Sequence, residues 1–168
     1  MISLEVSTFI RAPKAVIFEI IKDPLKLLRF TRGVESVEVL ESDKETTLVH
    51  FLGRFGWLKL SSVHRAFLKP PHKLRFRQVT GDFKSLKGAY TLEEGQGGTW
   101  VTYTVDFDLG IPLVGALWAK QAMKTMALEL LEGIRREAEE RGREAAIGST
   151  GLTANRGGRN RHRGVKGD

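Results

Sequence analysis

The sequence predicts an α+β fold in which one seven-stranded, curved antiparallel sheet wraps around a long C-terminal helix. Two observations support this prediction. Residues 2–108 contain seven stretches typical of strands, and residues 112–141 form an uninterrupted stretch with helical periodicity. A helix of that length spans about 45 Å at 1.5 Å per residue, so it needs a wide partner to cover its apolar side.

The composition is that of one globular domain with a tail. The chain has 168 residues, 41% of them hydrophobic, which suffices for a core. It has no cysteine, which excludes disulfides, thiolate catalysis and zinc–cysteine sites. Residues 1–13 lack the continuous apolar segment of a signal peptide, and no stretch approaches the roughly 18 apolar residues of a membrane span. We therefore expect a soluble, cytoplasmic protein.

The N-terminal part predicts one strand followed by two short helices. Residues 2–11 alternate between apolar and polar types, as in a half-buried strand. Pro13 suits the first turn of a helix over residues 13–22, and Asp23 suits the cap of a second helix over residues 25–30. These two short helices separate the first strand from the second.

The middle of the chain predicts an antiparallel meander, because strand-like stretches alternate with short clusters of turn residues. The last strand has the clearest alternation, so one of its faces should meet the helix and the other should meet water. The six expected strands cover residues 34–41, 45–53, 57–68, 73–80, 84–94 and 98–108.

The C-terminal helix is expected to begin in the turn of Pro112 and to end at Arg141, with Gly142 as a left-handed cap. Its apolar stripe is rich in alanine and methionine, and Gly133 lies inside it at a cost of about 1 kcal/mol relative to alanine. Small residues leave room, which predicts a ligand cavity between helix and sheet. The alternative is that large sheet side chains fill that room. The stripe consists of Ala116, Ala119, Met123, Met126, Ala127, Leu130, Ile134 and Ala138.

Much of the net charge of +7 lies in the C-terminal segment, where six basic residues face two acidic ones, and only +3 remains for the rest of the chain. This segment has few large apolar residues, so we expect one ligand-binding domain over residues 1–142 and a disordered basic tail over residues 143–168. An arginine- and glycine-rich tail binds RNA or anionic surfaces weakly and with strong salt dependence. Nucleic acid is otherwise not an expected partner.

Three polar side chains are candidates for binding a ligand inside the sheet. His64 interrupts an apolar strand face, and Tyr90 and Tyr103 lie on adjacent predicted strands. Ordinary core packing, or internal hydrogen bonding of His64, is the alternative for each. The helix residues Met123, Ala127 and Leu130 complete the expected ligand-binding set.

The sequence shows no motif for a metal, a cofactor or catalysis. No two of the four histidines have metal-ligand spacing, and no glycine-rich loop enters a helix. The turn over residues 53–57 carries two aromatic residues, Phe55 and Trp57, where a polar tip is usual. We expect them to form the rim of the pocket with Trp118, and to make transient contact with a membrane or a protein. The alternative is that they fold back onto the domain.

The order of elements resembles the START/polyketide cyclase (SRPBCC, helix-grip) superfamily, over residues 2–141. It looks like the polyketide cyclase/dehydrase and lipid-transport group, and is similar to coenzyme Q-binding proteins and to the branch of proteins like the G subunit of carbon monoxide dehydrogenase. The residues that carry the resemblance are Ile10-Arg11-Ala12-Pro13, Val16, Phe18, Asp23-Pro24, Gly81-Asp82-Phe83, residues 86–92, Gly98-Thr99, Val101 and Tyr103.

The resemblance implies a deep apolar cavity that holds a lipid, a quinone or a polyketide-like molecule. We therefore expect binding or transport of a hydrophobic small molecule, without a cofactor. One alternative is a cyclase- or dehydratase-type enzyme that uses the same cavity, although the inward strand face carries few acid–base groups. The other is an accessory protein that binds RNA or anionic surfaces through the basic tail.

Overall fold

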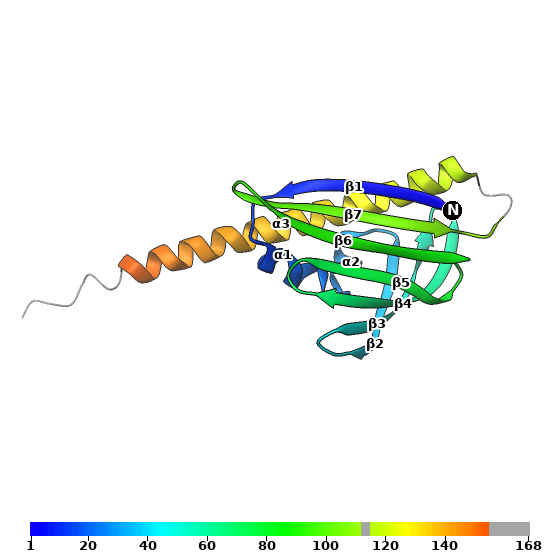
Figure 1. The fold of residues 1–168 in the computed structure, drawn as a ribbon, viewed down its shortest axis with the longest axis horizontal. Coiled ribbons are helices and arrows are strands. Elements are labelled where there is room, and N and C mark those ends of the chain that lie inside the picture. Colours follow the sequence, from blue (N-terminus) through cyan, green and yellow to red (C-terminus); the bar gives the residue numbers. More distant parts are fainter. Residues whose placement is uncertain (112–114, 155–168) are drawn as a thin grey trace, which may run out of the picture.

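The computed structural model describes residues 1–111 and 115–154. Strand β1 (Ile2–Ile10) is followed by helices α1 (Lys14–Ile21) and α2 (Lys26–Phe30), then by six strands and the long helix α3 (Ala116–Ala154) (Figure 1). The six strands are β2 (Val34–Ser42), β3 (Thr46–Phe55), β4 (Leu58–Lys69), β5 (Lys73–Gly81), β6 (Ser85–Gly95) and β7 (Gly98–Asp108).

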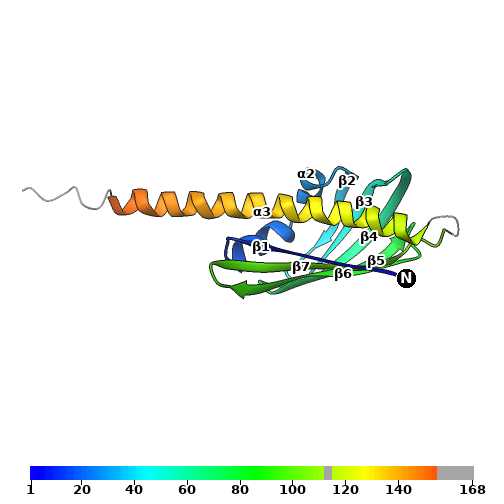
Figure 2. The ribbon, with the colours of Figure 1, turned by 90° about the horizontal axis from the view of Figure 1, so that it is seen from above.

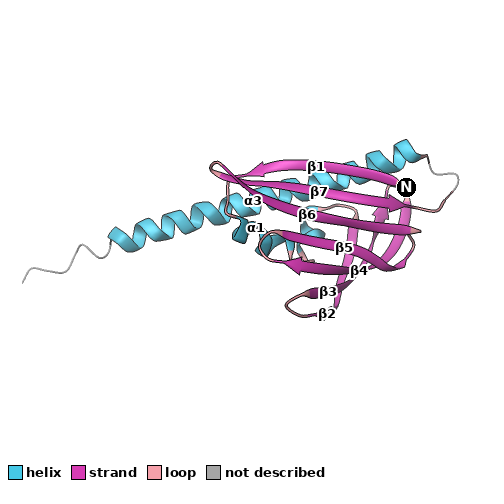
Figure 3. Cartoon of the chain, viewed as in Figure 1, coloured by secondary structure: helices cyan, strands magenta, loops and turns pink. Residues whose placement is uncertain are grey.

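All seven strands form one sheet in the order β1-β7-β6-β5-β4-β3-β2, and the register of each neighbouring pair is antiparallel. Strand β1 returns beside the last strand, from Ile2 opposite Phe107 to Ile10 opposite Thr99. Irregularities in the β2–β3 register, between Val34 and Ser36 and between Val39 and Glu41, increase the bending of that edge. The predicted α+β architecture is confirmed, since α3 lies across one face of a curved sheet (Figures 2 and 3).

The inner face of β7 forms the centre of the core. Its buried residues alternate with more exposed ones, as the sequence predicts. Thr99, the polar member of this face, donates a hydrogen bond from Oγ1 to the carbonyl oxygen of Ala12, 2.8 Å away. This bond fixes the start of β7 to the chain that enters α1. The buried residues are Thr99, Val101, Tyr103, Val105 and Phe107.

Helix α3 differs from its predicted bounds at both ends. Its first helical residue is Ala116, and Pro112 lies outside the described residues. The expected end at Arg141 with a cap at Gly142 is wrong, because α3 passes through Gly142 and continues beyond the sheet to Ala154 (Figures 1 and 2). A single glycine costs a helix only about 1 kcal/mol, and the residues that follow include good helix formers. Residues 155–168 of the expected tail lie outside the described residues.

The two short helices close one end of the sheet near their predicted positions. The side chain of Asp23 acts just before α2, where Oδ1 accepts a hydrogen bond of 3.0 Å from the backbone N–H of Leu25. Within residues 1–111 and 115–154, no helix combines the length and apolar character needed to cross a membrane.

Candidate ligand cavity

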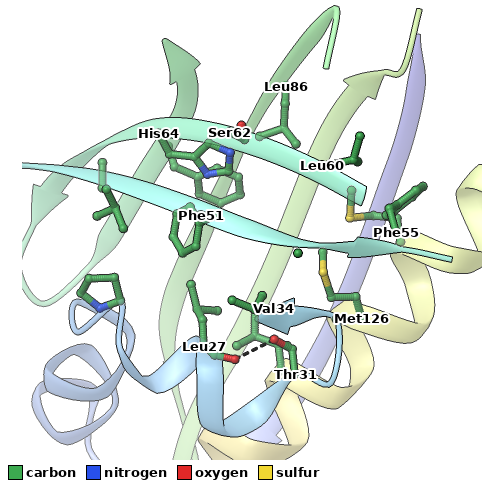
Figure 4. Close-up of a pocket in the computed structure, with 18 of the residues that line it drawn as sticks. Leu27, Thr31, Val34, Phe51, Phe55, Leu60, Ser62, His64, Leu86 and Met126 are labelled. Carbon is green, nitrogen blue, oxygen red and sulfur yellow. Dashed lines mark hydrogen bonds between the residues drawn. The ribbon is translucent and has the colours of Figure 1, made fainter. Parts of the chain in front are cut away.

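A cavity of ≈ 180 Å³ lies between the sheet, α3 and the segment that contains α1 and α2. In Figure 4, Leu27 and Thr31 of the α2 segment approach the same space as Phe51 of β3 and His64 of β4. An apolar cavity of about 150 Å³ is large enough to bind benzene, so this one has room for a single ring or a short chain. Its apolar lining includes Leu27, Val34, Val49, Phe51, Phe55, Leu60, Leu74, Phe76, Phe83, Leu86, Met123, Met126 and Leu130.

The entrance of the cavity is marked by the lining residues that are exposed to solvent. These are Lys22 at the end of α1 and Leu52 and Arg54 on β3. Both cations at the entrance are paired: Lys22 with Glu19 at 2.8 Å and Arg54 with Glu35 at 2.7 Å. The cavity therefore opens between the short helices and the β2–β3 edge of the sheet.

Two of the polar side chains in the lining are satisfied by the protein itself. Ser62 donates a hydrogen bond from Oγ to Oε1 of Gln78, 2.8 Å away. Thr31 donates from Oγ1 to the carbonyl oxygen of Leu27, 2.6 Å away (Figure 4). These groups have little hydrogen-bonding capacity left for a ligand.

His64 is not satisfied in this way. Its Nε2 is buried and has no hydrogen-bond partner among the described residues. Its ring centroid lies 5.0 Å from that of Phe51 and 6.0 Å from that of Phe76, nearly parallel to the latter. Burial lowers the pKa of His64 to about 4, so the imidazole is neutral at pH 7. A buried polar atom without a partner is uncommon and calls for a ligand, a water molecule or an energetic cost.

Tyr90 and Tyr103 face each other directly on β6 and β7, with ring centroids 5.1 Å apart, and both line the cavity. Burial raises the pKa of Tyr103, and burial together with repulsion between the two phenolate forms raises the pKa of Tyr90. Both phenols therefore stay protonated at neutral pH. A protonated phenol can donate one hydrogen bond and accept others.

Five of the six residues expected to bind a ligand line the cavity: His64, Tyr90, Tyr103, Met123 and Leu130. Ala127 does not, although its side chain is fully buried at 0% exposure. Here α3 is packed against its neighbours, so the small side chain reflects close packing and not empty space. Ala127 is therefore not part of the cavity wall in this structure, and its role in ligand binding stays a prediction.

The expected rim differs from the observed entrance. Phe55 is part of the lining but only 5% exposed, with its ring edge-on to Trp118 at 5.7 Å. Neither Trp57 nor Trp118 belongs to the lining, and Trp57 is 71% exposed. Trp118 covers Gly56, where an added Cβ would lie 2.2 Å from Cζ2 of the indole. Phe55 and Trp57 thus pack against Trp118 around the turn between β3 and β4, directly after the entrance residue Arg54.

Sequence reasoning missed two parts of the lining. Phe51 and Phe76 lie on inward faces of β3 and β5. Phe76 lies between Arg75 and Arg77, so alternation could have found it, but Phe51 lies between His50 and Leu52 and had no clear signal of that kind. The contribution of Leu27 and Thr31 had no such signal, since it depends on how α2 lies over the sheet. Among the described residues, no group of three or more His, Cys, Asp or Glu side chains could hold a metal ion.

A curved sheet that encloses an apolar cavity beneath a long C-terminal helix defines a helix-grip protein. The chain belongs to the polyketide cyclase/dehydrase and lipid transport family, whose sequence profile matches residues 10–134. This places it in the superfamily that the motifs resemble and supports, in general terms, a role in binding a hydrophobic ligand or in cyclisation.

The fold is similar to several solved structures. The protein TTHA0849 from Thermus thermophilus is 24% identical, with 81% of this chain and 96% of that chain covered and a TM-score of 0.73. The Zhui aromatase/cyclase from Streptomyces sp. R1128 is 20% identical, with coverages of 85% and 96% and a TM-score of 0.71. A START superfamily protein from Mycobacterium smegmatis is 13% identical, with coverages of 85% and 98% and a TM-score of 0.64. No curated protein has a significant sequence match to the chain.

Proposed function

We propose that this protein binds or carries a hydrophobic small molecule of the lipid, quinone or polyketide type in the cavity. The observation that carries the proposal is the unpaired Nε2 of His64 inside an apolar lining. Apolar walls bind the body of a ligand, and a few convergent polar groups fix its orientation. His64, Tyr90 and Tyr103 are the groups we assign to the polar end of the ligand.

The size of the cavity restricts what it takes without rearrangement. A volume of ≈ 180 Å³ is below the roughly 300 Å³ typical of sites for drug-sized ligands. The ligand, or the part of it that enters, is therefore a single ring or a short chain that bears an oxygen. Longer molecules require movement of the methionines Met123 and Met126, whose unbranched side chains adapt readily.

A thermal-shift screen with phenols, short-chain quinones and fatty acids tests the proposal. A ligand at one hundred times its dissociation constant stabilises the fold by about 2.7 kcal/mol. Ala66→Phe places a ring in the cavity and should abolish the shift, because Ala66 lines it. Ala89→Phe, on the outer face of β6, is the matched control and should leave the shift intact. An unchanged shift in folded Ala66→Phe protein would place the ligand elsewhere.

A cyclase- or dehydratase-type reaction in the same cavity is the second candidate. One observation favours it: a neutral histidine next to an aromatic cluster that includes two protonated tyrosines offers a base and two acids. The described residues that line the cavity include no carboxylate, so any proton transfer depends on these three groups. His64→Phe separates the two candidates, because loss of turnover with retained binding indicates an enzyme. If binding itself decreases and no substrate is turned over, His64 acts in recognition.

We also propose a cytoplasmic location, and the lack of cysteine is compatible with it, because a chain without cysteine needs no oxidising compartment. For transient contact with a membrane or protein we retain Trp57 alone, because it is exposed whereas Phe55 is buried. Replacing Trp57 by Ser should weaken binding to such a partner without changing the thermal shift caused by cavity ligands.

A further inference from the structure

The outer face of the sheet, opposite the cavity, carries cations on β4, β5 and β6, in alternation with residues that line the cavity. These three strands are neighbours in the sheet (Figure 1). The register places several of them directly opposite one another: Arg65 opposite Arg77, Arg77 opposite Lys87, and Lys69 opposite Lys73. We call this surface the cation patch. It consists of Arg65, Lys69, Lys73, Arg75, Arg77 and Lys87.

The cation patch is unfavourable for the protein alone, because like charges directly opposite on neighbouring strands destabilise a sheet. Two acidic side chains lie at the edges of the cation patch: Asp106 of β7 is directly opposite Lys87, and Glu41 of β2 lies near Arg65. Among the described residues, only Arg65 of the six forms an ion pair, at 3.7 Å from Glu41. The repulsion between these cations lowers the stability of the sheet and is not needed for folding. It therefore points to an anionic ligand that binds this face.

An aromatic side chain lies in the middle of these cations. Phe67 is directly opposite Arg75 and lies between Arg65 and Lys69 along β4. The guanidinium carbons of Arg75 and Arg77 lie 5.8 and 5.7 Å from the centroid of the Phe67 ring. Cations around an aromatic ring on an open surface are the combination that binds phosphates and stacks bases of single-stranded nucleic acid.

We propose that the cation patch binds single-stranded nucleic acid. Alternate residues on a strand are about 7 Å apart and neighbouring strands are about 4.8 Å apart, so the cations form a two-dimensional array over which a flexible phosphate chain can pass. Arginine forks bind phosphate oxygens in pairs. An acidic protein is a poorer fit, because the cation patch lacks the large apolar anchors on which protein interfaces depend. The proposal is independent of the cavity on the opposite face.

Fluorescence anisotropy with a labelled 12-nucleotide oligo(U) RNA tests this proposal on the full chain at 50 to 300 mM NaCl. We expect the double variant Arg75→Glu/Arg77→Glu to bind at least 10-fold more weakly at 50 mM NaCl. The slope of the logarithm of its association constant against the logarithm of the salt concentration should be shallower by about 1.4, because each of the two lost phosphate contacts contributes about 0.7. Phe67→Leu should weaken binding with little change in that slope, since stacking releases no counterions.

Two controls separate the cation patch from other basic segments. Lys120→Glu/Lys124→Glu changes the net charge equally on exposed positions of α3, and should reduce affinity by less than 3-fold. Arg156→Gln/Arg159→Gln/Arg161→Gln tests the C-terminal segment. If either control loses as much affinity as the sheet variant, or if the wild type does not bind RNA at 50 mM NaCl, the proposal is wrong. The proposal would also be wrong if the cation patch bound poly-glutamate or phosphatidylserine vesicles and RNA did not displace them.

The sheet variant must be folded for these comparisons, which circular dichroism establishes. If Arg75→Glu/Arg77→Glu does not fold, Lys69→Glu/Lys87→Glu removes two other members of the cation patch. The same loss of affinity is expected from that pair, and full affinity would contradict the proposal.

Discussion

The ring of Phe30 in α2 occupies the space that the missing side chain of Gly133 leaves on α3. A Cβ added at Gly133 would lie 2.4 Å from Cγ and 2.7 Å from Cβ of Phe30, so the whole side chain would have to move. Leu27, one turn earlier in α2, lines the cavity. The glycine that weakens α3 as a helix is therefore the position that lets α2 lie close to it at the cavity wall.

Gly133→Ala should destabilise the protein, even though alanine favours the helix by about 1 kcal/mol. Overpacking costs about 1 to 3 kcal/mol, so we expect the free energy of unfolding to fall by about 1 to 2 kcal/mol in urea denaturation. In a Phe30→Ala background the steric conflict is absent, and there Gly133→Ala should stabilise. An increase in stability in the wild-type background would show that Phe30 moves aside freely.

Lys26 and Glu137 form a second link between α2 and α3. Nζ and Oε1 are 2.6 Å apart, and the side chains are only 17% and 18% exposed. Lys26→Met should lower the free energy of unfolding by about 1 to 3 kcal/mol, because it removes a hydrogen bond between charged groups that are mostly buried. Lys22→Met is the matched control, since its pair with Glu19 is exposed, and it should change stability by less than about 0.5 kcal/mol.

The pH dependence of this pair has a definite sign. Burial raises the pKa of Glu137, but the hydrogen bond and charge of Lys26, with Arg141 and Arg29, outweigh it and lower the pKa below 4.5. A carboxylate with a lowered pKa stabilises the fold above its unfolded pKa and loses that contribution as pH falls through the folded pKa. The stability difference between wild type and Lys26→Met should therefore shrink as pH falls below 4.5. A difference that is constant down to pH 3 would contradict this account.

The strands could be predicted from sequence because their signals are local. Each of the seven strands lies within two residues of its predicted bounds, since alternation and turn residues determine where a strand begins and ends. The end of α3 could not be predicted in this way. Gly142 is a common type of cap residue, but a cap also requires the chain to turn, and nothing in the fold makes α3 turn there.

The site was predictable only in part, for a physical reason that differs between residues. His64, Tyr90 and Tyr103 follow from strand alternation, which decides the face on which a side chain lies. Ala127 shows the limit of that reasoning, because a small side chain fits both an empty space and a close contact, and only packing distinguishes them.

The cation patch was hidden for another reason. Arg65 and Arg77 lie on different strands, so their proximity depends on the register of the strands. The net charge of a segment does not report which of its residues are neighbours in the fold. The expectation of nucleic acid only at the tail followed from the net charge of each segment, and binding at the cation patch stays a proposal.

His64 should make stability depend on pH in mildly acidic solution. Burial lowers its pKa from 6.5 to about 4, so between these values the unfolded chain binds a proton that the folded protein does not. The stabilising effect of the neutral imidazole is complete above pH 6.5 and is lost as pH falls toward 4, by up to about 3 kcal/mol.

Urea denaturation from pH 7 to pH 4 measures this effect. His64→Phe should lose less stability than wild type over that range. His50→Phe is the control, because Nε2 of His50 has a partner in Oγ of Ser61, 2.8 Å away. If the free energy of unfolding depended on pH equally in wild type and His64→Phe, the buried imidazole would take up a proton without an energetic cost.

Ala66 and Ala127 should respond in opposite ways to a larger side chain. Ala66 lines the cavity, so Ala66→Phe should fill existing space and leave the free energy of unfolding within about 1 kcal/mol of wild type. Ala127 is fully buried outside the lining, so Ala127→Trp has no space to enter and should cost about 3 kcal/mol or more. Urea denaturation of both variants at pH 7 measures the contrast. A stable Ala127→Trp protein that no longer binds cavity ligands would contradict this expectation. It would mean that the cavity extends beneath this part of α3, as the sequence of the alanine stripe predicts. The volume available to a ligand would then be larger than ≈ 180 Å³.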